Sequence, residues 1–203
     1  MSGIVTQNTL GSSGLIKAPE AGGGAWTLIE TLTSDGSDAS MSFTSGIDAT
    51  YPIYCFQFIN IHSESNDKQL SWQVNASGQS GFNETIHSSF FDAYHNEGNT
   101  AALGYRYIVG FDQANGTGYQ PLGVLGGDND FVGDGFLYLF SPSSTVFVKH
   151  FISRLSAGEN LYAKDLNGSG HINTTSAITE IDFKMSEDEI QGGKIKMFGL
   201  KDS

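Results

Sequence analysis

The sequence consists of short segments in which apolar and polar residues alternate, and these segments are rich in aromatic and β-branched side chains. Gly, Asn, Asp, Ser or Pro bounds each one, a pattern typical of β-strands separated by turns. The expected strands are Trp26–Leu32, Ala39–Thr44, Ile53–Ile61, Gln69–Ala76, Phe82–Ser88, Gly104–Val109, Phe136–Phe140, Thr145–Arg154, Ile178–Met185 and Lys194–Lys201.

Helical patterns are scarce. Two stretches, Phe90–Glu97 and Ser186–Ile190, lack Gly and have a helical composition, but each is too short for an independent helix, so we expect loop turns there. Strands at regular spacing without helices between them favour an antiparallel sheet over a parallel α/β sheet. The sequence therefore predicts an all-β fold, an antiparallel jelly-roll-like β-sandwich.

The segment Thr145–Arg154 shows the two-residue period well. One face would carry Val146, Val148, His150 and Ile152, and the other Phe147, Lys149, Phe151 and Ser153. We expect Phe147 and Phe151 to face the core. Because both faces carry apolar residues, the strand can be buried on both sides.

The chain has 203 residues, of which 38% are hydrophobic, enough for one large β-domain with a core. Residues 1–25 are Gly/Ser-punctuated and nearly uncharged, without the charged and apolar regions of a secretory signal, so we expect an extended N-terminal arm that acts as an anchor or tether. Residues 26–203 would form a single β-sandwich domain. The apolar contacts of the arm would come from Ile4, Val5, Leu10, Leu15 and Ile16.

The formal net charge is −12. Such a surface repels phosphate backbones and anionic lipids, so we expect binding neither to nucleic acid nor to membranes. Cys55 lies among large apolar residues and is expected to be a buried small hydrophobe rather than a catalytic thiol.

Metal binding has weak support. The segment from Asp165 to Gly170 matches the first half of an EF-hand loop, but Ser176 occupies the position of the required bidentate carboxylate, so a plain Asn-Gly turn is favoured. The loop with Asp128, Asp130 and Asp134 leaves open whether an ion binds there. The five histidines, His62, His87, His95, His150 and His171, form no metal-binding motif. We expect no metal and no cofactor.

No nucleophile elbow, phosphate-binding loop or dinucleotide fingerprint is present, so the sequence favours a protein that is not an enzyme. Paired carboxylates for glycoside hydrolysis follow no local spacing rule, so this possibility stays open. The longest irregular stretch, Phe111–Gly135, is expected to be a loop, and loops of this length are usually functional or interfacial.

Several phrases carry a resemblance to a known family. They are Ser42–Asp48, Phe56–His62, Phe90–Glu97, Phe111–Gly118, Phe140–Arg154, Ile172–Ile178 and Phe183–Lys201. In these phrases the chain resembles uncharacterised virion structural proteins of tailed bacteriophages from aquatic, especially marine, environments. The resemblance implies a capsid decoration (cement) protein located in the virion. It further implies a homo-oligomer, expected to be a homotrimer, bound to the major capsid protein or to tail proteins.

An alternative is a tail or fibre appendage component that binds host-surface carbohydrate. In that case the candidate glycan contacts are Tyr105, Tyr107, Tyr119 and Tyr138, because aromatic rings stack on sugar rings. Aromatic residues in strands are more often part of a core, so both interpretations stay open at this point.

Overall fold

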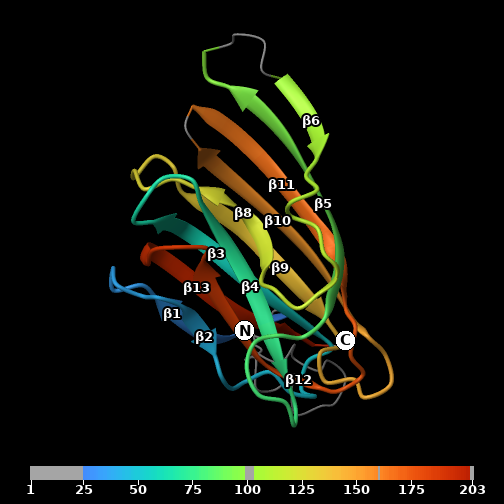
Figure 1. Ribbon diagram of the computed structural model, residues 1–203. Helices are drawn as coiled ribbons and strands as arrows, with labels where there is room; N and C mark the ends of the chain where they lie inside the picture. The colour runs from blue at the N-terminus through green and yellow to red at the C-terminus, as the bar shows by residue number, and fades with distance from the viewer. Residues whose placement is uncertain (1–24, 99–102, 160, 202–203) are drawn as a thin grey trace, which may run out of the picture.

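The computed structural model describes residues 25–98, 103–159 and 161–201, which form an antiparallel two-sheet sandwich (Figure 1). The predicted arm residues Ile4, Val5, Leu10, Leu15 and Ile16 lie outside the described residues. Within the described part of the chain no helix is long and apolar enough to cross a membrane. The predicted all-β, jelly-roll-like antiparallel sandwich is confirmed, and its two sheets are unequal in size.

The large sheet has nine strands in the order β1-β13-β3-β9-β10-β11-β5-β6, with β7 also paired to β5. Its strands are β1 Trp26–Thr33, β3 Ile53–Ser63, β5 Ile86–Asn96, β6 Leu103–Tyr107, β7 Ala114–Gly116, β9 Gly133–Phe140, β10 Lys149–Glu159, β11 Tyr162–Ile172 and β13 Ile190–Leu200. The small sheet has the order β2-β12-β4-β8, with β2 Met41–Phe43, β12 Ile178–Met185, β4 Lys68–Ala76 and β8 Gln120–Leu125. The chain therefore passes repeatedly from one sheet to the other.

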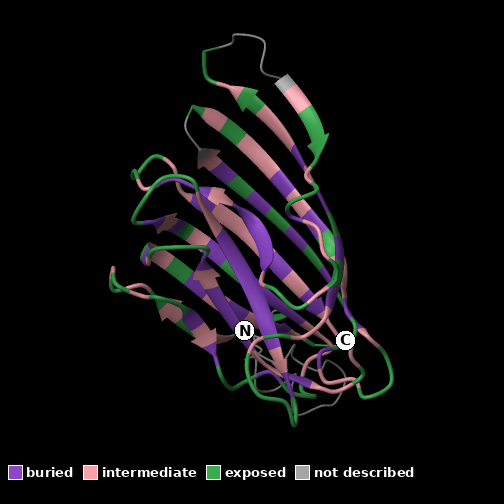
Figure 2. Ribbon diagram, in the orientation of Figure 1, coloured by how far each residue is buried: buried purple, intermediate pink, exposed green. Residues whose placement is uncertain are grey.

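The core lies between the two sheets (Figure 2). Phe183 of β12 contacts Phe56 and Phe58 of β3, with ring centroids 5.5 and 5.4 Å apart. Trp72 of β4 meets Phe151 of β10 edge to face at 4.8 Å. Each contact joins one sheet to the other, so the aromatic side chains that alternate along the strands hold the sandwich together.

The predicted alternation in Thr145–Arg154 is correct from Lys149 onward and wrong before it. Phe151 is buried on the inner face, and Lys149 is also buried there, with its ammonium donating to the carbonyl of Thr174 at 3.1 Å. Phe147 is 71% exposed, because β10 begins only at Lys149 and the preceding residues form a loop. The expected core position of Phe147 is therefore wrong.

Three further expectations are corrected. Phe90–Glu97 is not a loop turn, because β5 continues through it to Asn96. The segment with Asn167 and Gly168 is neither a calcium loop nor a turn, because it lies in the middle of β11. The stretch Phe111–Gly135 is not one irregular loop, since it contains β7, β8 and the start of β9.

Gly168 explains why the sequence pattern indicated a turn where the structure has strand β11. A Cβ atom on Gly168 would lie 2.8 Å from the Ser153 hydroxyl and 3.0 Å from the Phe90 ring. Glycine is therefore placed there so that Phe90 can pack against the strand, and not because the chain turns.

Candidate functional site

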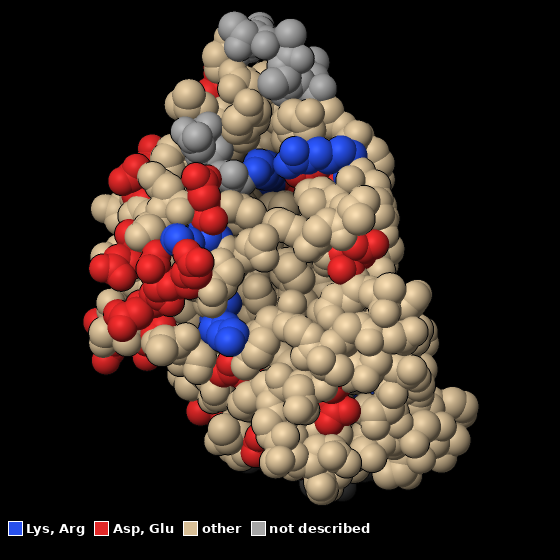
Figure 3. All heavy atoms as spheres, in the orientation of Figure 1, with Lys and Arg blue, Asp and Glu red and all other residues tan. Residues whose placement is uncertain are grey.

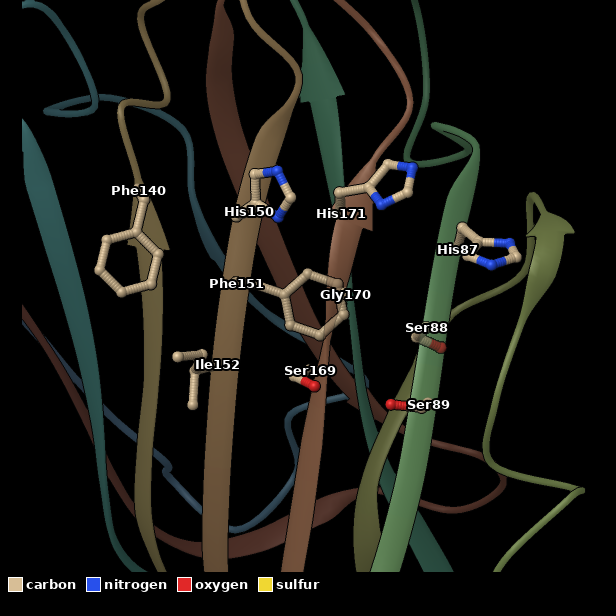
Figure 4. A pocket seen from close by; sticks show the side chains of 10 residues that line it. All are labelled: His87, Ser88, Ser89, Phe140, His150, Phe151, Ile152, Ser169, Gly170 and His171. Atoms are coloured by element: carbon tan, nitrogen blue, oxygen red, sulfur yellow. The ribbon is translucent and has the colours of Figure 1, made fainter.

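The outer face of the large sheet, which points away from the small sheet, gathers the most distinctive side chains of the described residues. Antiparallel pairing places His150 of β10 opposite His171 of β11, and His171 opposite His87 of β5. Because side chains alternate between faces, all three imidazoles lie on this outer face in one row across three strands (Figure 4). We call these three residues the histidine row.

The histidine row borders a shallow cavity of about 500 Å³. Figure 4 shows the next row below it, where Ile152, Ser169 and Ser89 lie on the same three strands, with Phe140 to one side. The ring centroids of His87 and His171 are 5.6 Å apart, as are those of His150 and His171. The middle ring is thus in contact with an imidazole on each side.

The position of His171 lowers its pKa. Burial disfavours the imidazolium and is the largest cause, and the neighbouring His150 and His87 add repulsion between like charges.

Among the described residues no group of three or more His, Cys, Asp or Glu is arranged to hold a metal ion. Two carboxylates that the sequence analysis considered for metal binding have other partners. Asp134 accepts a hydrogen bond from the amide of Asn60 at 2.8 Å, and Asp165 pairs with Arg154.

An aromatic patch continues the outer face toward β1. We define it as Trp26, Phe136, Tyr138 and Phe198, which surround a cavity of about 380 Å³ together with Cys55 and Gln57. The Tyr138 ring lies 5.8 Å from Trp26 and 5.0 Å from Phe136. Trp26 is 43% exposed, so this patch is open to solvent and is not part of the core.

Cys55 agrees with its predicted role as a buried small hydrophobe. It lies at the floor of the aromatic patch, is 3% exposed, and burial raises the pKa of its thiol to about 12. A thiol with that pKa is almost entirely protonated at neutral pH and is therefore a poor nucleophile.

The four candidate glycan-contact tyrosines do not form one platform. Tyr138 belongs to the aromatic patch, whereas Tyr105 and Tyr107 lie on the same outer face but on the edge strand β6. Strands β9 and β6 are four strand spacings apart, roughly 19 Å. Tyr119 contacts the small sheet instead, where its hydroxyl donates to Asp182 at 2.8 Å and Lys184 lies over its ring.

On the face seen in Figure 3, acidic side chains gather at one end of the sandwich. Backbone hydrogen bonds tie together the four loops that carry them, for example from the amide of Glu64 to the carbonyl of Glu189, and from Ile190 to Asp38. The loops contribute Asp35, Asp38, Glu64, Asp67, Asp128, Asp130, Glu187, Asp188 and Glu189. Much of the net negative charge is therefore remote from the aromatic patch.

Sequence reasoning missed the histidine row. No spacing rule links the three residues, because each belongs to a different strand and meets its neighbours only through the pairing register. The one available signal was the Lys149–Ile172 hairpin, which aligns His150 with His171 once β11 is recognised as a strand.

Comparisons of the chain with protein-family models, with curated proteins and with solved structures find no match.

Proposed function

We propose that this protein is a structural component of a bacteriophage particle, a capsid decoration protein that assembles with copies of itself through the outer face of the large sheet. The observation that carries the proposal is the aromatic patch together with Leu28 and Ile152. Trp26, Leu28 and Ile152 are each about half exposed, and Phe136, Tyr138 and Phe198 beside them are partly exposed. Apolar clusters of this kind commonly mark surfaces that pack against another protein.

The charge distribution favours a second copy of the chain as the partner that covers the outer face. Two chains of net charge −12 repel each other, and the repulsion is smallest when their acidic ends stay apart. Contact through the outer faces satisfies this condition, because the acidic loops lie at one end of the sandwich. The charged pair Arg154 and Asp165 on the same face is already mutually compensated.

The virion role itself rests on the resemblance of the chain to phage structural proteins and on this assembly surface. The alternative, an appendage that binds host carbohydrate through the four tyrosines, has less support because the fold separates them. No described constellation of residues favours catalysis over binding.

The experiment has two parts. First, sedimentation velocity of the full chain is compared with that of Leu28→Glu/Ile152→Glu, with Leu161→Glu at the tip of the β10–β11 hairpin as the control. We expect the wild type and the control to be oligomeric and the double variant to be monomeric but folded by circular dichroism. A monomeric wild type would refute assembly through this face.

Second, a cryo-electron microscopy reconstruction of the purified virion should show the chain distributed over the shell, with outer faces packed together. Density confined to the tail would replace the decoration role by the appendage role. Absence of the chain from purified particles would overturn the virion role altogether.

A further inference from the structure

The histidine row carries hydrogen-bonding groups that the protein itself does not use. In Figure 4 the hydroxyls of Ser169 and Ser89 lie in the row below the imidazoles, and all five side chains border the same cavity of about 500 Å³. Within the described parts of the chain, no group forms a hydrogen bond with the three imidazoles or with these two hydroxyls. The cavity is therefore bordered by five polar side chains that are able to bind a ligand.

The spacing of the imidazoles suits one ligand shared by two rings. Neighbouring ring centroids are 5.6 Å apart on both sides of His171. A hydrogen bond spans about 2.8 Å, so an ion between two rings lies within reach of both. A protonated imidazole has two N–H donors and no acceptor, so the ligand has to supply acceptor atoms.

Protonation of the row produces positive charge without a neighbouring carboxylate. Burial is the largest cause of the lowered pKa of His171, and the other causes are the positive charges of His150 and His87. No carboxylate raises the pKa of this imidazole. Between pH 7.5 and 5.5 an ordinary histidine changes from mostly neutral to mostly charged, so the row gains charges that repel one another.

The other charged residues on this face are compensated or distant. On the outer face of β9, β10 and β11 they are Asp134, Arg154 and Asp165. Asp134 accepts a hydrogen bond from a backbone amide at 2.8 Å, and Arg154 and Asp165 form an ion pair with an N to O distance of 2.8 Å. The titratable residue of the same face on β5 is His95, eight residues from His87.

The segments next to the row do not compensate it either. Residues 141–148, which lead into β10, and residues 173–177, which follow β11, contain no charged residue. Before β5, Glu84 accepts a hydrogen bond from a backbone amide at 3.1 Å, and before β7, Asp112 accepts one from a tyrosine hydroxyl at 2.5 Å. Opposite charge for the protonated row would therefore come from a ligand.

The acidic loops lie too far away to exclude an anion. Asp128 and Asp130 precede β9, which begins at Gly133 and ends at Phe140 beside the row. The 8 residues of this strand span about 23 Å, more than two Debye lengths at physiological ionic strength. Repulsion from these loops is therefore largely screened at the row.

We propose that the histidine row binds an oxyanion group, a sulfate or a phosphate, when the pH falls below neutral. His171 and one neighbouring imidazole donate hydrogen bonds to its oxygens, and a serine hydroxyl of the row below donates another. Binding and protonation strengthen each other, because the anion favours the charged imidazoles and the charged imidazoles attract the anion. The proposal does not depend on the assembly role, although the row and the assembly surface share one sheet face.

The test is a titration of the full-length protein with sodium sulfate at pH 5.5 and 7.5, at an ionic strength held constant with sodium chloride. Sulfate keeps its double charge over this range, so a change in affinity reports the state of the protein. NMR signals of the histidine ring C–H groups follow binding. We expect the dissociation constant to be at least tenfold lower at pH 5.5, with shifts at His87, His150 and His171. Equal dissociation constants at the two pH values, or equal shifts at His95, would overturn the proposal.

Three variants test the row directly. His171→Gln should weaken sulfate binding at pH 5.5 by about tenfold, and His95→Gln, the matched control on the outer side of β5, should bind like the wild type. His150→Lys places a permanent charge at an exposed position of the row, so it should bind sulfate nearly as well at pH 7.5 as at pH 5.5. Wild-type affinity in His171→Gln, or binding by His150→Lys only at low pH, would contradict the proposal.

Methyl sulfate, which carries a single charge, distinguishes a free ion from an ester group on a larger molecule. Tighter binding of sulfate assigns the row to the free dianion, whereas equal or tighter binding of methyl sulfate assigns it to an ester group. Both results support the site, and failure of both ligands to bind at pH 5.5 would refute it. Sedimentation velocity of the same samples keeps the two proposals separate, because a monomeric wild type that binds sulfate would refute assembly alone.

Discussion

Arg106 binds Asp92 across β6 and β5 with Nε and Nη2 each donating to one carboxylate oxygen at 2.8 Å. Arg154 binds Asp165 across β10 and β11 in the same two-pronged manner, at 2.8 and 2.9 Å. The two pairs differ in burial, because the Asp92 side chain is fully buried on the inner face and that of Asp165 is 41% exposed on the outer face. The protein thus contains two nearly identical ion pairs in different surroundings.

Loss of the arginine should therefore have unequal consequences. Arg106→Gln leaves a buried carboxylate without its charged partner and should lower the free energy of unfolding by about 2 kcal/mol, below the usual value for a buried pair because Arg106 is itself half exposed. Arg154→Gln should cost much less, since Asp165 is then solvated by water. Urea denaturation of both variants measures the difference, and equal losses would show that burial of Asp92 is unimportant.

The histidine row should make stability depend on pH. The pKa of His171 is lower in the folded protein than in the unfolded chain, so the unfolded state binds more protons as the pH falls. The contribution of His171 is absent at high pH, where both states are neutral, and becomes destabilising as the pH falls through the unfolded value near 6.5. We expect the free energy of unfolding to decrease between pH 7.5 and 5.

His171→Gln should flatten this part of the pH profile. His95→Gln is the matched control, because His95 is an exposed histidine on the outer side of β5, two strands from β10. Chemical denaturation at a series of pH values compares the variants. If His171→Gln and His95→Gln change the slope equally, contact within the row is not the cause.

Replacement by alanine should be costly at Gly168 and nearly neutral at Gly110. Gly168→Ala forces a Cβ atom against the Ser153 hydroxyl and the Phe90 ring, and we expect a loss of about 1–3 kcal/mol from overpacking. Gly110→Ala meets no atom within 4 Å, so its effect should stay within about 0.5 kcal/mol. Thermal or urea unfolding of the two variants distinguishes them, and a neutral Gly168→Ala would contradict the tight packing on Phe90.

The Trp72–Phe151 contact supplies a further prediction. Phe151→Ala should cost about 3–5 kcal/mol, because it removes a buried ring that joins the two sheets. Trp72→Phe should cost less than about 2 kcal/mol, since the buried Trp72 indole nitrogen has no hydrogen-bond partner and its removal offsets part of the lost packing. Equal losses, measured by chemical denaturation, would indicate that the indole nitrogen is satisfied in solution.

Local sequence patterns determined the strands that alternate cleanly. Ile178–Met185 is predicted with the same ends as β12, and the all-β class follows from many such segments. The alternation in β10 also placed Phe151 on the core face correctly. These features depend only on neighbours along the chain, and a two-residue period is visible there.

The tertiary structure decided what no local pattern contains. The sequence pattern did not predict β11, because its glycines resemble a turn. Gly168 is instead required by the ring of Phe90 on another strand. The histidine row and the Arg106–Asp92 pair likewise depend on which strands pair and in what register. The sequence by itself determined an acidic chain of β-strands. Only long-range pairing decided that His150, His171 and His87 meet on one face and Arg106 and Asp92 on the other, because register is set by the packing of distant residues.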